Sequence, residues 1–140
     1  MIVLDTSVLI YAVGADHQLR APSTDLIDAI GRGELPATTT VEVIQEFTHV
    51  RARRRDREDA AGLAAQYLTL LTPLITVTAD DLRAGLDRFR RSSTIGCFDA
   101  VLVAAAQRIG APLVTADRVL LDEHEGAVPL AEAPARFLGR

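Results

Sequence analysis

The sequence predicts an α/β fold in which a parallel β-sheet is covered on both faces by helices. Short apolar runs suited to buried strands alternate with longer segments suited to helices, an order typical of parallel sheets. The segment from Phe98 to Ile109 is almost wholly apolar, so we expect a central buried helix there. A chain of 140 residues is large enough for one such core and too small for two, so we expect a single domain over residues 1–140.

The predicted elements are separated by glycine, proline or polar residues. In the first half they are a strand at 2–4, a helix at 7–13, a helix from Pro22 to about Ile30, a strand at 35–38 and a helix from about Val41 into an arginine-rich run. In the second half they are a helix at 59–71, a strand at 74–77, a helix at 79–89, a loop at 92–96, a helix at 98–109, a strand at 112–115, a short turn or helix at 116–121 and a weak strand at 127–130.

Four acidic residues lie next to apolar elements and not on a charged face: Asp5, Glu46, Asp99 and Asp117. Asp5 and Asp117 follow apolar strands, and Asp99 begins the buried helix. In open parallel sheets, ligand sites lie beyond the carboxyl ends of the strands, near the point where the strand order reverses. We therefore expect these carboxylates to meet at one site.

The third predicted helix holds two candidates for that site, Glu42 and Glu46. Its apolar stripe consists of Val43, Ile44, Phe47 and Val50. At about 100° per residue, Glu46 falls roughly 40° from the edge of this stripe and Glu42 about 80° away. This phase favours Glu46 as the site residue and places Glu42 in water, near His49, but the choice between them stays open.

Each acid also has an alternative role that is purely structural. Asp5 and Asp99 suit a helix N-terminus, Asp117 suits a turn, and Glu46 suits the surface. A cluster of bare carboxylates, however, would raise its own pKa values and destabilise the fold unless a cation neutralised it. Taken together, the four positions predict one divalent metal site.

The chemistry of the candidate ligands favours a hard ion. Cys97 is the only cysteine, and His17, His49 and His124 have no ligand spacing. Oxygen ligands alone select Mg²⁺ or Mn²⁺ and disfavour zinc. With such an ion the natural reaction is phosphodiester hydrolysis, because the metal activates a water molecule and stabilises the leaving oxygen.

The net charge of −4 does not describe a general nucleic-acid binder, so the positive charges must be considered locally. All 15 cationic residues are arginine, and five of the seven residues from Arg51 to Arg57 are arginine. A second basic group consists of Arg83, Arg88, Arg90 and Arg91. Such runs are either solvated helix faces paired with carboxylates or contacts for an RNA backbone. The candidate RNA contacts are Arg51, Arg53, Arg54 and Arg55.

Several features predict a cytoplasmic protein that does not span a membrane. No apolar run reaches 18 residues. The N-terminus has no basic leader, and Asp5 interrupts the first apolar stretch early. A lone cysteine fits a reducing compartment. The chain contains neither lysine nor asparagine, a bias expected when AT-rich codons are avoided, so we expect a bacterium with a GC-rich genome.

Four motifs in this chain resemble those of PIN domains, and specifically those of the VapC ribonuclease toxins of bacterial toxin–antitoxin pairs. The motifs are IVLDTSVLI at 2–10, VIQEF at 43–47, FDAVL at 98–102 followed by Ala104 to Ala106, and LVTAD at 113–117. Each motif is weak by itself, but the set in this order and spacing is specific and covers nearly the whole chain.

The resemblance implies a single PIN domain over residues 1–140, a three-layer fold with a central, mainly parallel β-sheet flanked by α-helices. It implies that an acidic site holds Mg²⁺ (or Mn²⁺), with these members: Asp5, Glu46, Asp99 and Asp117. Asp5 and Asp99 would be the surest direct ligands. Thr6 and Thr115 would orient carboxylates or water, although capping and strand-end hydrogen bonds explain them equally well.

The resemblance also implies partners and a cellular role. It implies a homodimer, an RNA substrate such as tRNA or a ribosomal RNA loop, and inhibition by a cognate VapB-like antitoxin whose tail occupies the groove. The protein would then inhibit translation and growth by cleaving RNA.

Two other functions remain open at this point. A PIN scaffold could retain the fold and act only in RNA or protein binding. A metal-dependent phosphatase or receiver domain also places an aspartate after its first strand, but such sites usually need a second nearby carboxylate and a lysine. This chain has Ser7 at the position of the second carboxylate in one such family and no lysine at all.

Overall fold

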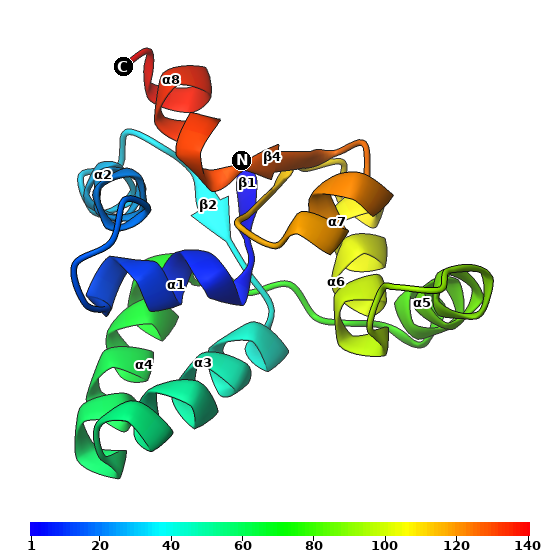
Figure 1. The fold of residues 1–140 in the computed structure, drawn as a ribbon, viewed down its shortest axis with the longest axis horizontal. Helices are drawn as coiled ribbons and strands as arrows, with labels where there is room; N and C mark the ends of the chain where they lie inside the picture. Colours follow the sequence, from blue (N-terminus) through cyan, green and yellow to red (C-terminus); the bar gives the residue numbers. More distant parts are fainter.

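A four-stranded parallel sheet forms the centre of the computed structural model, which describes residues 1–140 (Figure 1). The strands are β1 (Ile2–Leu4), β2 (Ala37–Thr38), β3 (Leu113–Thr115) and β4 (Ala127–Pro129), in the spatial order β2-β1-β3-β4. Every pairing between neighbouring strands is parallel. The predicted α/β class with a central parallel sheet is confirmed.

The order of the strands places the carboxyl ends of β1 and β3 side by side. Val3 lies opposite Thr38 of β2 on one side and opposite Leu113 of β3 on the other. The chain therefore runs outward from β1 in both directions, and the strand order reverses there. Asp5 follows β1 directly and Asp117 follows β3, so both acids emerge at this reversal point, where open parallel sheets bind ligands.

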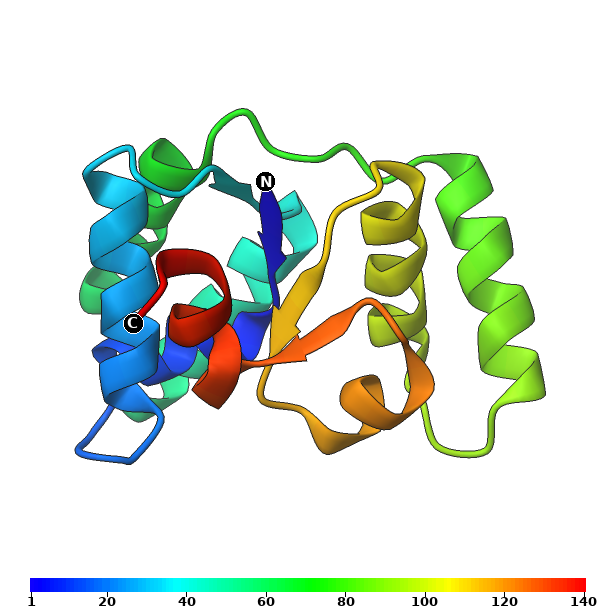
Figure 2. The ribbon, with the colours of Figure 1, turned by 90° about the horizontal axis from the view of Figure 1, so that it is seen from above.

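Helices cover the sheet on both sides. They are α1 (Thr6–Val13), α2 (Arg20–Gly31), α3 (Val41–Arg54), α4 (Arg57–Leu71), α5 (Ala79–Arg91), α6 (Cys97–Arg108), α7 (Arg118–Glu123) and α8 (Ala133–Leu138), with a 3₁₀ turn η1 (Leu130–Glu132) before the last. Figures 1 and 2 show α6 between the sheet and α5 on one side, with α1, α2 and α4 on the other. None of the helices is both long and apolar enough to cross a membrane.

Helix α6 is buried as the sequence predicted, and it lies very close to α5. Ala105 and Ala106 are fully buried. The backbone of Gly85 in α5 lies against Val101, since a Cβ atom added at Gly85 would come within 2.6 Å of the Val101 side chain. A glycine at this position therefore lets the two helices touch.

The predicted strand at 74–77 is wrong. Only Ile75 forms a bridge, to Thr40, and its amide donates to the Thr39 carbonyl at 2.9 Å. Leu74 and Ile75 are apolar because they pack against the core, and not because they form a ladder. In Figure 2 this segment is the connection that passes from α4 to α5 over the edge of the molecule.

The C-terminal helix α8 was not predicted, and the weak strand at 127–130 is one residue too long. The structure ends β4 at Pro129 and begins η1 at Leu130. The sequence does contain both helix signals: Pro134 lies in the first turn, and Gly139 follows the helix in the left-handed conformation with φ of 72°.

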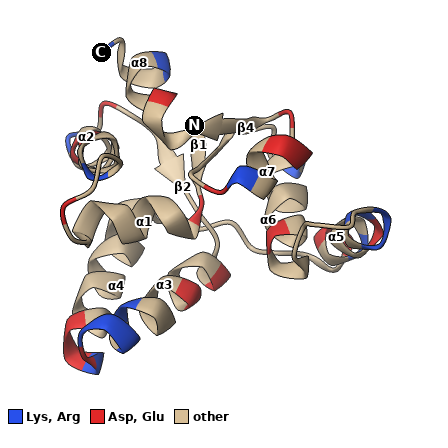
Figure 3. Ribbon diagram, viewed as in Figure 1, with Lys and Arg blue, Asp and Glu red and all other residues tan.

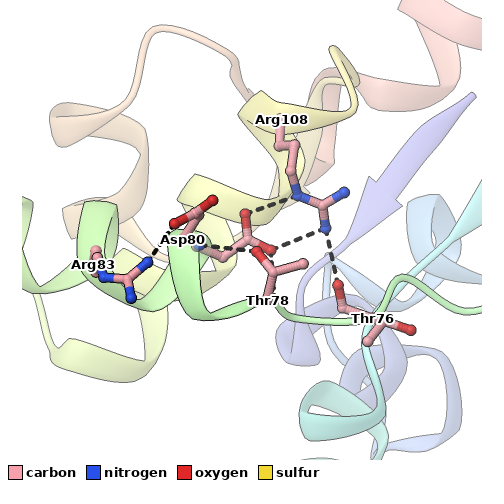
Figure 4. Close-up of polar contacts among 6 residues, drawn as sticks. Thr76, Thr78, Asp80, Arg83 and Arg108 are labelled. Atoms are coloured by element: carbon pink, nitrogen blue, oxygen red, sulfur yellow. Dashed lines mark hydrogen bonds and ion pairs between the residues drawn. The ribbon is translucent and has the colours of Figure 1, made fainter.

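An ion pair between a buried carboxylate and a partly exposed guanidinium joins the start of α5 to the end of α6 (Figure 4). The Arg108 guanidinium donates to both carboxylate oxygens of Asp81 at 2.9 Å, and also to the Thr76 carbonyl. The Asp81 carboxylate accepts the Thr78 amide as well, completing a capping box. Arg108 therefore holds the pKa of Asp81 below its ordinary value, and this carboxylate, 3% exposed, is fully paired.

Replacing Arg108 by Met should lower the free energy of unfolding by about 2 kcal/mol, because it leaves a buried carboxylate without its cation. Urea denaturation measures the change. The matched control is Arg83→Met, which removes an ion pair to Asp80 between side chains that are 75% and 88% exposed. That variant should remain within about 0.5 kcal/mol of wild type. Equal effects of the two substitutions would contradict the role assigned to Arg108.

Candidate active site

A cavity of about 290 Å³ opens where the ends of β1 and β3 meet α1, α3 and α6. It is lined by Asp5, Thr6, Ser7, Ile10, Tyr11, Glu46, Asp99, Ala116 and Asp117. The structure thus brings together around one cavity the four acids that the sequence singled out. Figure 3 shows acidic positions at the end of β1, on α3 and at the start of α6 around the middle of the molecule. Glu42 is exposed and does not line this cavity.

Asp5 is held by two hydroxyl groups that donate to the same oxygen. Its Oδ2 atom accepts Ser7 Oγ at 2.9 Å and Thr115 Oγ1 at 2.6 Å, while Oδ1 accepts no hydrogen bond from the protein. The side chain makes no capping bond to the backbone of α1. Asp5 thus occupies the N-cap position of α1, but its side chain does not cap the helix, and its free oxygen is left for a ligand in the cavity.

The two hydroxyl groups are themselves fixed by backbone amides from β3 and its following turn. Ser7 Oγ accepts the Ala116 amide at 3.0 Å, and Thr115 Oγ1 accepts the Asp117 amide at 3.0 Å. Ser7 was not among the predicted site residues. The amide that fixes its hydroxyl, that of Ala116, lies 109 residues away in the chain, so only the place of Ser7 two residues after Asp5 in the N-terminal motif could have pointed to it.

Asp117 has a structural role as well as a place on the cavity wall. Its Oδ1 atom accepts the amides of Val119 at 2.8 Å and Leu120 at 3.4 Å, so this side chain caps α7. The alternative role proposed for Asp117 from sequence is thus present in the structure. Its second oxygen accepts no hydrogen bond from the protein, which leaves that oxygen available to a ligand.

Thr6 of α1 and Glu46 of α3 face each other. Burial raises the pKa of Glu46, the nearby Thr6 hydroxyl opposes that rise, and the negative charge of Asp5 adds to it. The Thr6 hydroxyl is nevertheless buried and forms no hydrogen bond of normal geometry. A buried polar atom without a partner beside an acidic cavity fits a site completed by a water molecule or a ligand.

Of the four acids, Asp99 has the pKa that is raised most clearly. Its pKa is raised to about 7, first by burial and then by the negative charges of Asp5, Asp117 and Glu46. No arginine lines the cavity to offset these charges. The carboxylates therefore lack a countercharge from the protein, a condition that a bound cation would relieve.

The donor set fits Mg²⁺ or Mn²⁺, since the acids that line the cavity are all carboxylates and no histidine or cysteine lines it. No three acidic, histidine or cysteine side chains lie close enough together to form a complete ligand cage. This spacing suits Mg²⁺, which usually keeps several water molecules and binds one or two carboxylates directly. Zinc, which takes three or four close protein ligands, fits poorly.

Comparison with known proteins identifies the family. The PIN-domain model matches residues 2–124. Ribonuclease VapC7 of Mycobacterium tuberculosis (strain ATCC 25618 / H37Rv) is 49% identical over 127 residues, covering 87% of this chain and 86% of that protein. Ribonuclease VapC23 of the same strain is 31% identical, covering 79% and 86%. The chain therefore belongs to the PIN-domain family. Within that family it falls in the VapC group, to which both relatives belong by name.

Solved structures share the fold at lower sequence identity. The structure of PAE2754 from Pyrobaculum aerophilum aligns with a TM-score of 0.68 at 22% identity, covering 99% of this chain and 97% of that one. A structure of VapBC2 from Rickettsia felis, bound to a DNA fragment from the promoter, aligns with a TM-score of 0.68 at 16% identity, covering 92% and 97%. These likenesses confirm the three-layer PIN-like architecture.

The raised pKa of Asp99 predicts that the metal-free protein loses stability as the pH rises. The native state holds a proton up to about pH 7, whereas the unfolded chain releases it near 3.8, so the native state binds more protons between these values. This contribution to stability is therefore complete below about pH 4 and lost as the pH rises through about 7. In EDTA, the Tm of the wild type should fall over this range.

The Asp99→Asn variant should show a smaller fall in Tm across the same range, because it has no carboxyl group to titrate there. Glu42→Gln, which changes an exposed acid outside the cavity, is the matched control and should follow wild type. Identical pH profiles for wild type and Asp99→Asn would show that Asp99 does not sit among unneutralised carboxylates.

Proposed function

We propose that this protein is a divalent-metal-dependent endoribonuclease that acts as the toxin of a toxin–antitoxin pair. The observation that carries the proposal is the convergence of Asp5, Glu46, Asp99 and Asp117 on one cavity without any countercharge from the protein. The VapC relatives named as ribonucleases, similar over most of their length, support RNA as the substrate.

In this proposal Asp5 and Asp99 hold the ion, while Glu46 and Asp117 bind directly or through water. A bound Mg²⁺ or Mn²⁺ supplies the activation of water and the neutralisation of charge on the leaving oxygen. Ser7 and Thr115 keep the Asp5 carboxylate in one orientation with Oδ1 free. Because burial and the neighbouring acids raise the pKa of Asp99 to about 7, an ion held there would compete with a proton, and its binding should strengthen as the pH rises toward 8.

The arginine-rich end of α3 supports an RNA-binding surface, but Arg51 is not one of its RNA contacts. Arg51 is only 13% exposed, and its guanidinium donates to Asp59 at 2.6 Å and to the Val13 carbonyl at 3.0 Å. It joins α3 to α4 and α1 and is a structural residue. By contrast, Arg53, Arg54 and Arg55 form no ion pair within the protein.

Beside these arginines lies an open groove of about 630 Å³ between α3 and α4. It is lined by Gln45, Thr48, His49, Ala52, Arg53, Arg57, Ala60 and Ala61. Because Gln45 is the neighbour of Glu46 in α3, the groove begins close to the acidic cavity. We propose that it holds the RNA backbone, since guanidinium and hydroxyl groups bind phosphate and the acidic cavity repels it.

The remaining proposals concern partners, organisation and location. The VapBC2 structure, named as a complex, supports a VapB-like antitoxin as partner. We propose a tRNA or ribosomal RNA loop as the substrate, a homodimer, a cytoplasmic location in a bacterium, and one PIN domain over residues 1–140. On α5 the apolar side chains of Leu82, Leu86 and Phe89 are 45–47% exposed at helical spacing, which favours self-association.

The purified protein should cleave RNA in Mg²⁺ or Mn²⁺ and lose that activity in EDTA. Asp5→Ala and Asp99→Asn should each lower the cleavage rate at least about a hundredfold, because each removes a group that holds the ion. Sequencing of the RNA ends gives the cleavage site, and circular dichroism checks that each variant is folded. In cells, induced wild type should stop growth and Asp5→Ala should not.

Glu42→Gln is the matched control, because Glu42 is an acid of the same helix as Glu46 but lies outside the cavity. It should cleave RNA at the wild-type rate. Undiminished cleavage in EDTA would contradict the metal mechanism, and harmless expression of an active enzyme would contradict the toxin role.

Replacing Arg53, Arg54 and Arg55 together by Gln should weaken RNA binding and flatten its dependence on salt. Each lost phosphate contact on a single strand lowers the slope of log K against log[salt] by about 0.7, so the triple variant should lose roughly 2 units of slope. Arg90→Gln with Arg91→Gln is the control, because both residues pair with Asp87 on α5. A slope unchanged in the triple variant would assign the run to an ordinary solvated helix face.

A further inference from the structure

The acidic cavity is lined by one aromatic side chain, Tyr11, which suits contact with a nucleotide base better than with a metal ion. Its only non-polar lining residues are Ile10, Tyr11 and Ala116, and no arginine reaches it. The cavity therefore has no ion pair with which to hold a phosphate. Apart from a bound ion, the protein offers no positive group to hold a nucleotide against the acids, so contacts to the base would add to its binding, and Tyr11 offers the largest surface for such contacts.

Tyr11 differs from the other aromatic residues in its surroundings. The chain has two tyrosines and four phenylalanines, and Tyr11 is the only one of the six that lines the acidic cavity. Tyr67 and Phe47 pack edge to face in the core with ring centroids 5.0 Å apart, and the Tyr67 hydroxyl donates to the Leu9 carbonyl. Tyr11 is half-buried at the cavity wall.

The imidazole of His17 lies against the Tyr11 ring. The ring centroids are 4.8 Å apart and the planes are tilted by 32°. His17 is exposed, yet its orientation is fixed, because its Nδ1 atom accepts the Leu19 amide at 3.0 Å. The loop after α1 therefore presents a second ring in a defined position beside the cavity. The two rings pack together and form one aromatic patch beside the cavity.

We propose that Tyr11, supported by His17, is the surface on which one unpaired base of the RNA stacks, next to the phosphate at the acidic site. The proposal rests on the proposed ribonuclease function and adds a positioning and specificity residue to it. Single-stranded RNA is commonly recognised by stacking of splayed bases on aromatic side chains. Such a contact holds the nucleotide at the acids without a positive side chain, while the groove on α3 and α4 holds the backbone further along the strand.

The test is a cycle that pairs protein variants with RNA variants. The substrate is a short single-stranded RNA that the wild type cuts at one bond, with an abasic nucleotide placed in turn at each position flanking that bond. For wild type, one position should raise KM roughly tenfold when its base is missing, with kcat changed less than about twofold. Tyr11→Leu should raise KM for the intact RNA by a similar factor.

The decisive result is the combination of the two changes. If the base stacks on Tyr11, removing it should have no further effect on Tyr11→Leu, whereas abasic nucleotides elsewhere should act as they do on wild type. Tyr11→Phe and Tyr11→Trp should retain binding, and His17→Ala should show a smaller form of the Tyr11→Leu defect. Independent effects that multiply at every position, or a Tyr11→Phe variant as defective as Tyr11→Leu, would overturn the proposal.

A binding measurement separates this proposal from the ribonuclease proposal. The same RNA carrying 2-aminopurine at the sensitive position is titrated in Ca²⁺, which occupies oxygen sites. Its fluorescence should be quenched on binding to wild type and to Tyr11→Phe, and not on binding to Tyr11→Leu. Equal quenching by Tyr11→Leu would overturn the stacking role while leaving RNA cleavage intact. An absence of both RNA binding and cleavage in the wild type would instead refute the ribonuclease function and the stacking role together.

Discussion

The hydrogen bonds that converge on the Asp5 carboxylate join the parts of the molecule on which the site depends. Asp5 directly follows β1, Ser7 belongs to α1, and Thr115 ends β3. Through these bonds the first residues of the chain are fixed to a segment more than 100 residues later. The position of β1 between β2 and β3 brings the ends together, and the hydroxyl groups then set the direction of the carboxylate. Without these hydrogen bonds, the Asp5 carboxylate would not be fixed relative to the acids on α3 and α6.

The same arrangement concentrates negative charge at the cavity, where no cationic side chain neutralises it. Burial and like charges act together on Asp99 and Glu46, and both pKa values are raised. The one buried acid away from the cavity, Asp81, is paired with Arg108. The contrast shows that the fold pairs charges where they only support structure and leaves them unpaired at the cavity. Stability in the absence of a cation is lower there, which is the usual cost of a site prepared for a ligand.

The sequence predicted those features that depend on local pattern. Strands β1 and β3 were found because buried parallel strands are continuous apolar runs, and the phase of α3 pointed to Glu46 over Glu42 as the acid beside the cavity. The segment at 74–77 is apolar because it packs against the core, and the sequence does not reveal that it pairs at one bridge only, Ile75 with Thr40. The role of Ser7 and the pairing of Arg51 with Asp59 depend on contacts across the fold, so pattern alone could not give them.

The asymmetry of the bonds to Asp5 has a consequence for the most conservative change at that position. Both hydroxyl groups already accept a backbone amide, so each must direct its own hydrogen at the Asp5 side chain. An asparagine at this position would have to offer its single carbonyl oxygen to those hydrogens. Its amino group would then point into the cavity with its positive end toward any cation. The isosteric replacement would therefore reverse the local dipole, not merely remove a charge, and the geometry of two hydroxyl groups alone dictates this outcome.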